Sequence, residues 1–210
     1  MITLTDMTLT DFCTAIASKE PAPGGGSVAA MSAAMGIGLV GMVAQLTIGR
    51  KKYAEHQDLM QEIIVQSEEL RHKLVSAIDR DTLAYNEVAA VFSMPKETDA
   101  DKAARAAAME ISLKAATAVP QEVMGLCLAA LDLAEKAVGR SNTNAASDLG
   151  VAAHTLLAGA HGAWMNVLIN LSGIRDAEFV QQTKTDGAAI IKQAEKSAEA
   201  IISYVMAEIF

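Results

Sequence analysis

The residues with the clearest chemical potential lie in one short segment around Asp81. Tyr85 follows Asp81 by four residues, so in a helix the two side chains share a face. Ile78 and Val88 belong to the same face, which predicts that it points toward the protein interior. Burial raises the pKa of a carboxyl group, which makes it a usable general acid or base. The spacing is equally compatible with a solvated acid that pairs with Arg80 or Lys73.

The segment 21–27, Pro-Ala-Pro-Gly-Gly-Gly-Ser, is a second candidate. Gly24, Gly25 and Gly26 break any preceding helix, and Ser27 is a natural N-cap for the next one. Backbone N–H groups at a helix N-terminus favour a bound anion. On composition alone a flexible connection is the simpler interpretation. The segment is not a P-loop, because the Lys-Ser/Thr ending is absent.

A third candidate is the polar segment 141–148, Ser-Asn-Thr-Asn-Ala-Ala-Ser-Asp, with an apolar helix after it. Asn166 and Asn170 lie four residues apart on that helix, and buried amides must pair with the backbone or with a polar ligand. Capping of the helix by Ser147 or Asp148 explains the segment more simply, and capping does not exclude contact with a ligand.

Few other residues suggest chemistry. Arg50, Lys51 and Lys52 form a short basic cluster after a neutral run, which either caps a helix end or attracts an acidic ligand. His154 and His161 lie seven residues apart, but no His-Glu-x-x-His motif or cysteine pair supplies further ligands. The sequence therefore predicts no metal site.

Helices are the elements that must position these residues. Apolar residues recur every three to four positions, and Pro, Gly or short polar runs separate the periodic stretches. The expected helices cover about 9–18, 27–48, 54–92, 98–118, 120–139, 147–171 and 175 to the C-terminus. Thr8, with Asp11 three residues on, is expected to cap the first of these helices, and Thr98, with Asp101, the fourth. Long helices with short loops predict an all-α fold, an antiparallel bundle of six to seven helices with long central helices, forming a single domain over residues 1–210.

The second expected helix has an unusual stripe of small residues. Ala30, Ala34 and Gly38 recur every four positions, so another backbone can approach closely, either within the bundle or from a partner subunit. Two runs, Pro21–Gly49 and Leu149–Ile174, contain no Asp, Glu, Lys or Arg and exceed the ~18 residues of a membrane span. Their content of Ala, Gly, Ser, Thr and Asn favours central helices of a soluble bundle, so no membrane partner is expected.

Composition narrows the class of protein further. The chain has 210 residues, 51% of them hydrophobic but only 4% aromatic, which argues against an all-β fold and against disorder. A net charge of −8 argues against a non-specific nucleic-acid binder. Cys13 and Cys127 lie in apolar helical patterns and are expected in the core. Without a disulfide framework or a secretory signal, a cytoplasmic location is expected.

Taken together, the motifs resemble those of the cyclodeaminase/cyclohydrolase family of folate enzymes. The match runs in order through nearly the whole chain, over 21–30, Gly49-Arg50-Lys51, Asp81-Thr82-Leu83-Ala84-Tyr85, Pro95-Lys96, 147–153 and 166–171. The resemblance implies an all-helical homodimer with a folate pocket between subunits. It implies either closure of 5-formiminotetrahydrofolate to 5,10-methenyltetrahydrofolate with release of ammonia, or interconversion of 5,10-methenyl- and 10-formyltetrahydrofolate.

The resemblance also suggests roles for individual residues. The family's catalytic aspartate maps to Asp81, with Asp79 as the alternative. The expected substrate-binding residues are Gly24, Gly25, Gly26, Ser27, Tyr85, Asn142, Asn144, Ser147, Asp148, Arg50 and Lys51. The expected pocket lies between the 24–27 and 144–148 segments, and the anionic glutamate tail meets Lys19 or the 50–52 cluster. The substrate carries its own one-carbon unit, so no metal or redox cofactor is expected. The alternative is a non-enzymatic helical scaffold for oligomer assembly.

Overall fold

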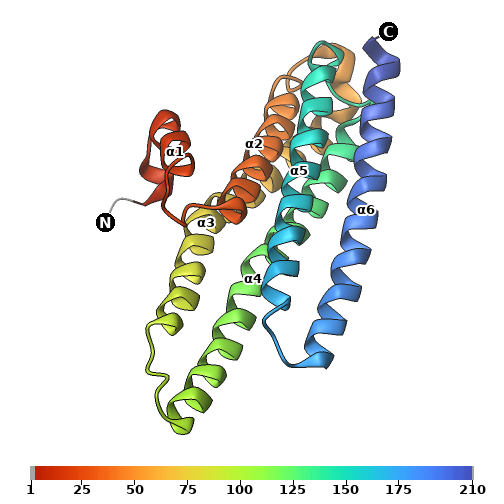
Figure 1. Cartoon of the computed structure of the whole chain (residues 1–210). Coiled ribbons are helices and arrows are strands. Elements are labelled where there is room, and N and C mark those ends of the chain that lie inside the picture. Colours follow the sequence, from red (N-terminus) through yellow and green to blue (C-terminus); the bar gives the residue numbers. More distant parts are fainter. Residues whose placement is uncertain (1–2, 210) are drawn as a thin grey trace.

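The computed structural model describes residues 3–209, and within that range it contains helices and connecting turns but no strand (Figure 1). The α-helices are α1 (Leu9–Ile16), α2 (Gly25–Gln45), α3 (Gln57–Phe92), α4 (Asp99–Ala137), α5 (Ala146–Leu171) and α6 (Ala177–Ile209). Short 3₁₀ helices cover Leu4–Asp6, Lys51–His56 and Thr143–Ala145. The all-α expectation is confirmed.

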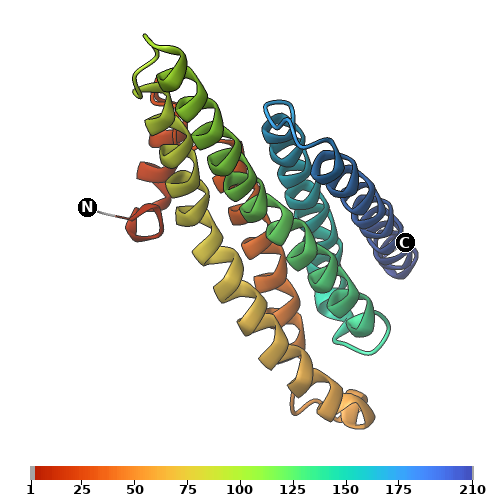
Figure 2. The ribbon, with the colours of Figure 1, turned by 90° about the horizontal axis from the view of Figure 1, so that it is seen from below.

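The helices form an antiparallel bundle in which α2 is central. It packs against α3 and α5, with α4 behind it, while α6 lies along α5 and α4 (Figures 1 and 2). The bundle is uneven at one end, because α3 and α4 extend well past the start of α2 (Figure 1). Where α2 begins, the groove between α3 and α5 is therefore left without its central helix.

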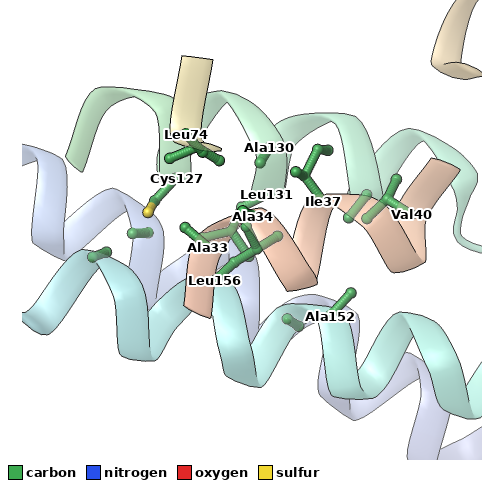
Figure 3. Close-up of a cluster of buried hydrophobic side chains, with 14 of the residues drawn as sticks. Ala33, Ala34, Ile37, Val40, Leu74, Cys127, Ala130, Leu131, Ala152 and Leu156 are labelled. Atoms are coloured by element: carbon green, nitrogen blue, oxygen red, sulfur yellow. The ribbon is translucent and has the colours of Figure 1, made fainter. Parts of the chain in front are cut away.

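Small residues bring α2 close to its neighbours, as the sequence predicted (Figure 3). Ala30, Ala33 and Ala34 are buried among α3, α4 and α5. At Gly36 an added Cβ would lie 2.7 Å from the Leu156 side chain of α5, so only glycine permits this approach. The tight packing fixes the N-terminus of α2 relative to α3 and α5.

The predicted break before Pro120 is wrong, because α4 continues through that residue. A proline inside a helix loses one backbone hydrogen bond and costs ~3 kcal/mol or more. Val123 and Met124 follow Pro120 and are almost completely buried, and each such side chain contributes about 1.5–3 kcal/mol. Core packing on both sides of Pro120 thus offsets the local cost, and two expected helices are one.

Two of the predicted caps are confirmed and two are not. Thr8 accepts a hydrogen bond from the Asp11 backbone N–H, and Thr98 forms a capping box with Asp101. Ser27 is not the N-cap of α2, since Gly24 takes that position and the Ser27 hydroxyl points toward α3 instead. The start of α5 at Ala146 likewise excludes capping by Ser147 or Asp148.

The two cysteines differ in their burial. Cys127 is buried, and burial raises the pKa of its thiol to about 12. Cys13 is exposed, so its expected place in the core is wrong; in α1 only Phe12 is buried.

By length and composition, α2 and α4 could cross a membrane, yet 61% and 50% of their most apolar stretches are buried within the bundle. Such burial is typical of core helices.

Candidate active site

A cavity of ≈ 290 Å³ occupies the groove at the point where α2 begins. Its walls come from α3 and α5, its floor includes Ala116 of α4, and the glycines 24–26 close one end. Asp81 and Tyr85 line the α3 wall, while Asn166 and Asn170 line the α5 wall. The structure thus joins the first two sequence candidates, the acidic segment and the glycine segment, in one site.

The Asp81 carboxylate lies against the first turn of α2. The Ser27 hydroxyl lies 3.1 Å from Asp81 Oδ2 and 3.0 Å from the Ile78 carbonyl oxygen, and it can donate to either. The hydroxyl also lies 3.3 Å from Thr82 Oγ1. Gly26 provides the space: an added Cβ there would lie 2.5 Å from Asp81 Cγ. The carboxylate is therefore fixed in position by contacts on several sides.

Opposing effects set the pKa of Asp81. Burial raises the pKa of this half-buried carboxyl group above its usual value, while hydrogen bonds from the side chain and backbone of Ser27 act in the lowering direction. Burial has the larger effect, so the net shift is upward. Asp81 is therefore a stronger base than an ordinary aspartate, and the N-terminus of α2 lies beside its negative charge.

The solvated, ion-paired alternative for Asp81 is excluded by its surroundings. Arg80, the expected partner, instead forms two hydrogen bonds of 2.7 and 3.0 Å with Glu122 of α4. Among residues 3–209, no Lys, Arg or His side chain forms an ion pair with Asp81. The carboxylate is thus left available to a molecule in the cavity.

The two α5 amides bring hydrogen-bonding capacity to the opposite wall. Asn166 Nδ2 donates to the Gly162 carbonyl oxygen at 2.8 Å. An added Cβ at Gly25 would lie 3.4 Å from the same nitrogen, so the glycine segment and the amide are in close contact. Asn170 lies one turn further along the same cavity wall. Together with Asp81, the two amides surround the cavity with polar groups.

Asp79, the alternative catalytic residue, lies outside this cavity. Its carboxylate accepts hydrogen bonds from the Leu4 backbone N–H at 2.6 Å and from Thr5 Oγ1 at 2.7 Å. These contacts hold the N-terminal 3₁₀ helix against α3. The geometry therefore gives Asp79 an anchoring role and leaves Asp81 as the acid of the site.

The expected pocket between the 24–27 and 144–148 segments does not exist within one chain. Arg50, Lys51, Asn142 and Asn144 line a separate cavity of ≈ 390 Å³ beyond the C-terminus of α2. The 21 residues of α2 span ~30 Å, so the two sites lie at opposite ends of this helix. The expected helix 27–48 already separated Ser27 from Arg50, but sequence order did not show at which end of it the 142–144 loop lies.

That second cavity is built on a hydrogen-bonded network. The Tyr53 hydroxyl accepts from the Thr143 backbone N–H at 3.0 Å, and Asn142 Oδ1 accepts from the Asn144 backbone N–H at 3.2 Å. Bonding to Thr143, opposed by burial, leaves the pKa of Tyr53 below its usual value. Ser147 and Asp148 lie in the first turn of α5, and neither lines either cavity.

Several wall residues were missed or only half identified from the sequence. Asn166 and Asn170 stood out as an amide pair, but nothing in their spacing linked them to Asp81. Thr82 and Ile169 also line the cavity; both lie within the motifs of the family resemblance, but neither was expected to contact the substrate. Within residues 3–209, no three His, Cys, Asp or Glu side chains are grouped as metal ligands, and the absence of a metal from the reaction stays a prediction.

Comparisons with known proteins match nearly the whole chain. A family model described as formiminotransferase-cyclodeaminase matches residues 8–189. The chain is 38% identical to a methenyltetrahydrofolate cyclohydrolase of Methylorubrum extorquens, with 96% of this chain and 97% of that protein covered. It is 34% identical to the formimidoyltransferase-cyclodeaminase of Sus scrofa, of which it spans only 36%. A crystal structure of a formiminotetrahydrofolate cyclodeaminase from Thermotoga maritima superposes with a TM-score of 0.79, 28% identity and coverage of 96% and 95% of the two chains.

Proposed function

This chain belongs to the formiminotransferase-cyclodeaminase family, and from that membership we propose that it is an enzyme acting on a C–N bond of one-carbon tetrahydrofolate derivatives. The observation that carries the proposal is the half-buried Asp81 carboxylate in a cavity lined by amides and backbone N–H groups. A scaffold that serves only oligomer assembly has no use for such an acid.

Two reactions fit the family, and they share one reacting carbon. Hydrolysis of 5,10-methenyltetrahydrofolate is the first candidate, because the cyclohydrolase of Methylorubrum extorquens matches this chain over nearly its full length. Cyclodeamination of 5-formiminotetrahydrofolate is the second, because the Thermotoga maritima protein of similar extent is a cyclodeaminase. Neither reaction requires a redox cofactor, since the substrate brings its own one-carbon unit.

Asp81 moves protons in either reaction. In hydrolysis it takes a proton from water as the oxygen attacks the methenyl carbon. The hydroxyl group of this adduct then loses its proton as the formyl C=O forms and the bond from that carbon to N5 breaks; one of the two protons goes to N5 and the other is released to solvent. In cyclodeamination, Asp81 takes the N10 proton as N10 attacks the formimino carbon, and ammonia leaves with a proton. A positioned acid or base of this kind contributes ~10²–10⁴-fold in rate.

The cavity suits the bicyclic head of the substrate rather than the whole molecule. Its volume of ≈ 290 Å³ lies at the lower end of the ~300–1,000 Å³ typical of ligand pockets. Asn166 and Asn170 offer amide groups to the ring nitrogens and carbonyl oxygen of a pterin, and Tyr85 offers an aromatic face. The rest of the substrate must then lie outside this cavity.

One assay tests the function and separates the two reactions. Purified protein is incubated with 5-formiminotetrahydrofolate or with 5,10-methenyltetrahydrofolate, and the ultraviolet band of the methenyl compound is followed. A rising band with the first substrate identifies the cyclodeaminase, and a falling band with the second, faster than in buffer, identifies the cyclohydrolase. No change beyond the buffer rate with either substrate would refute the proposal.

We also propose that two copies associate through the outer face of α2 and α5. Val28, Met35 and Met42 are exposed at seven-residue intervals along α2, a helix without any charged residue. Val151 and Met165 are exposed on α5, which lies beside α2 (Figure 1). Large uncharged exposed faces of this kind mark interaction surfaces. The family resemblance favours a second copy of the chain as the occupant.

A two-fold pairing of this face explains why the expected site residues lie at both ends of α2. If the two α2 helices run antiparallel, the cavity around Arg50 and Asn144 of each copy lies beside the Asp81 cavity of the other. Ile169 supports this arrangement, because it is exposed on the outer side of α5 and also lines the Asp81 cavity. The proposed dimer therefore encloses the substrate between two chains.

A further inference from the structure

A second hollow continues the groove beyond the Asp81 cavity, toward the end where α3 and α4 extend past α2. It has a volume of ≈ 250 Å³ and is lined by Lys96, Lys102, Arg105, Met109, Glu110 and Arg175, among others. On α4, Lys102, Met109 and Ala116 are seven residues apart, so the floor of this hollow and of the Asp81 cavity is one helix face. Four cations and a single acid thus lie in line with the proposed active site.

The one acid in the lining, Glu110, is already held by other partners, and of the four cations Lys102 pairs with Asp99 at 3.1 Å. Glu110 accepts hydrogen bonds from the backbone N–H groups of Arg175 and Asp176 at 2.9 and 3.2 Å, and it lies 3.7 Å from Lys114. These partners hold the pKa of Glu110 below its usual value. Lys96 and the Arg175 side chain form no ion pair within residues 3–209, so their charge is available to a ligand.

The position of Arg105 is fixed by the end of α3. Its Nε donates to the Val91 carbonyl oxygen at 3.2 Å, and its Nη2 lies 3.4 Å from the Phe92 carbonyl oxygen. The guanidinium also lies 5.9 Å from the Phe92 ring centre. An ordered guanidinium loses less side-chain freedom on binding an anion than a free one does.

Exposed aromatic rings connect the two hollows along α3. Tyr85 lines the Asp81 cavity, and Phe92 lies seven residues further along the same face of the helix. The two rings are 42% and 64% exposed, so both are accessible to a bound molecule. An aromatic ring of a bound molecule can lie along this wall.

We propose that this cationic hollow binds the glutamate tail of the folate substrate, with the aminobenzoyl ring lying along Tyr85 and Phe92. The inference rests on the proposed function, since it takes the pterin head to lie beside Asp81. Ala116 and Arg105 are 11 residues apart on α4, which is ~16 Å of helix, a distance suited to an aminobenzoyl group followed by glutamate. Tail carboxylates then meet Arg105, Lys96 and Arg175.

This assignment differs from the one suggested by the sequence. Lys19 lines neither hollow, and the 50–52 cluster lies at the opposite end of α2 in the same chain. A dimer brings the 50–52 cluster of the second copy back toward the Asp81 cavity, so it is the competing tail site. The experiment must therefore compare the two clusters directly.

The test compares substrates that carry one or three γ-linked glutamates. The double variant Lys96→Gln/Arg175→Gln removes two exposed cations and leaves the α3–Arg105 contacts in place. We expect KM for the triglutamate substrate to rise about fivefold for each cation removed, with a smaller rise for the monoglutamate and an unchanged kcat. Lys192→Gln, on α6, is the matched control and leaves all constants unchanged.

Three results would overturn the inference while leaving the proposed function intact. They are an unchanged triglutamate KM in the double variant, equal rises for both substrates, or a selective rise in Arg50→Gln instead. If the wild-type protein turns over neither folate substrate, the proposed function is refuted instead. In that case, calorimetry with aminobenzoyl-triglutamate still decides the matter: binding that the double variant weakens supports the hollow as a tail site, and no binding refutes it.

Discussion

Replacing Gly26 with alanine displaces the Asp81 carboxylate from its observed position. The new Cβ would lie 2.5 Å from Asp81 Cγ and 2.6 Å from Oδ2, whereas ordinary contacts begin at 3.4 Å. Relief of this overlap requires a shift of about 1 Å, and a misplacement of that size costs ~10²-fold in rate. We therefore expect kcat to fall by about two orders of magnitude. The overpacking also destabilises the fold by ~1–3 kcal/mol.

Substitutions at two other glycines serve as controls for Gly26→Ala. At Gly25 an added Cβ meets Asn166 Nδ2 at 3.4 Å, an ordinary contact, so Gly25→Ala keeps most of its activity. At Gly125, in the exposed middle of α4, nothing lies within 4 Å of the added atom. Gly125→Ala should leave turnover unchanged and stabilise the protein by ~0.5–1 kcal/mol through helix propensity. Turnover is followed by the methenyl absorbance, and stability is measured by urea unfolding.

Two outcomes with these three variants would contradict the reasoning. Wild-type turnover in folded Gly26→Ala would mean that the carboxylate position beside α2 has no role in the reaction. An equal loss of activity in Gly25→Ala or Gly125→Ala would mean that general helix effects, rather than the contact with Asp81, cause the defect.

Three further predictions concern the pKa of Asp81, the contact of Asp79 with the N-terminal segment and the proposed dimer face. Ser27→Ala removes a hydrogen bond to the Asp81 carboxylate, so its pKa rises further and the acid limb of the kcat/KM profile moves to higher pH; a shift to lower pH would contradict the account. Asp79→Asn keeps activity within about twofold but makes the N-terminal segment more sensitive to protease; a large loss of turnover would restore Asp79 as a catalytic candidate. Met35→Lys yields a monomer by light scattering, whereas Val65→Lys, equally exposed on α3, does not; a Met35→Lys dimer would exclude the proposed face.

The pH dependence of stability follows from the same carboxyl group. Because the folded-state pKa of Asp81 is raised, its contribution to stability is fully present below pH 3.8, its usual pKa, and is lost as the pH rises through the folded-state value. At neutral pH the buried charge therefore costs stability. This cost is consistent with a residue kept for chemistry rather than for folding.

Local patterns in the sequence predicted most of the fold. The apolar periodicity identified the helices, and Thr8 and Thr98 were recognised as caps because capping depends on neighbouring residues alone. Pro120 was misjudged because burial of the following residues, a tertiary effect, outweighs the local cost of proline. Ser27 was misjudged because its hydroxyl turns toward Ile78 of α3, which lies 51 residues away in the chain.

The parts of the candidate site that were predicted are the Asp81 face of α3 and the glycines 24–26, which local sequence defines. The spacing of Asp81 and Tyr85 placed both side chains in the same cavity. The assignment of Asn142 and Asn144 to that cavity failed, because sequence order does not reveal at which end of α2 a loop lies. The cationic hollow was missed for the same reason, since its residues come from three separate segments.

The most direct test of the account is the turnover of Asp81→Asn, which has nearly the same shape as the wild type but cannot accept a proton. The methenyl absorbance is followed with both folate substrates, and circular dichroism verifies the helical fold. We expect a loss of ~10²–10⁴-fold in kcat with unchanged helix content. Full turnover in the folded variant would contradict the central claim that Asp81 carries the proton.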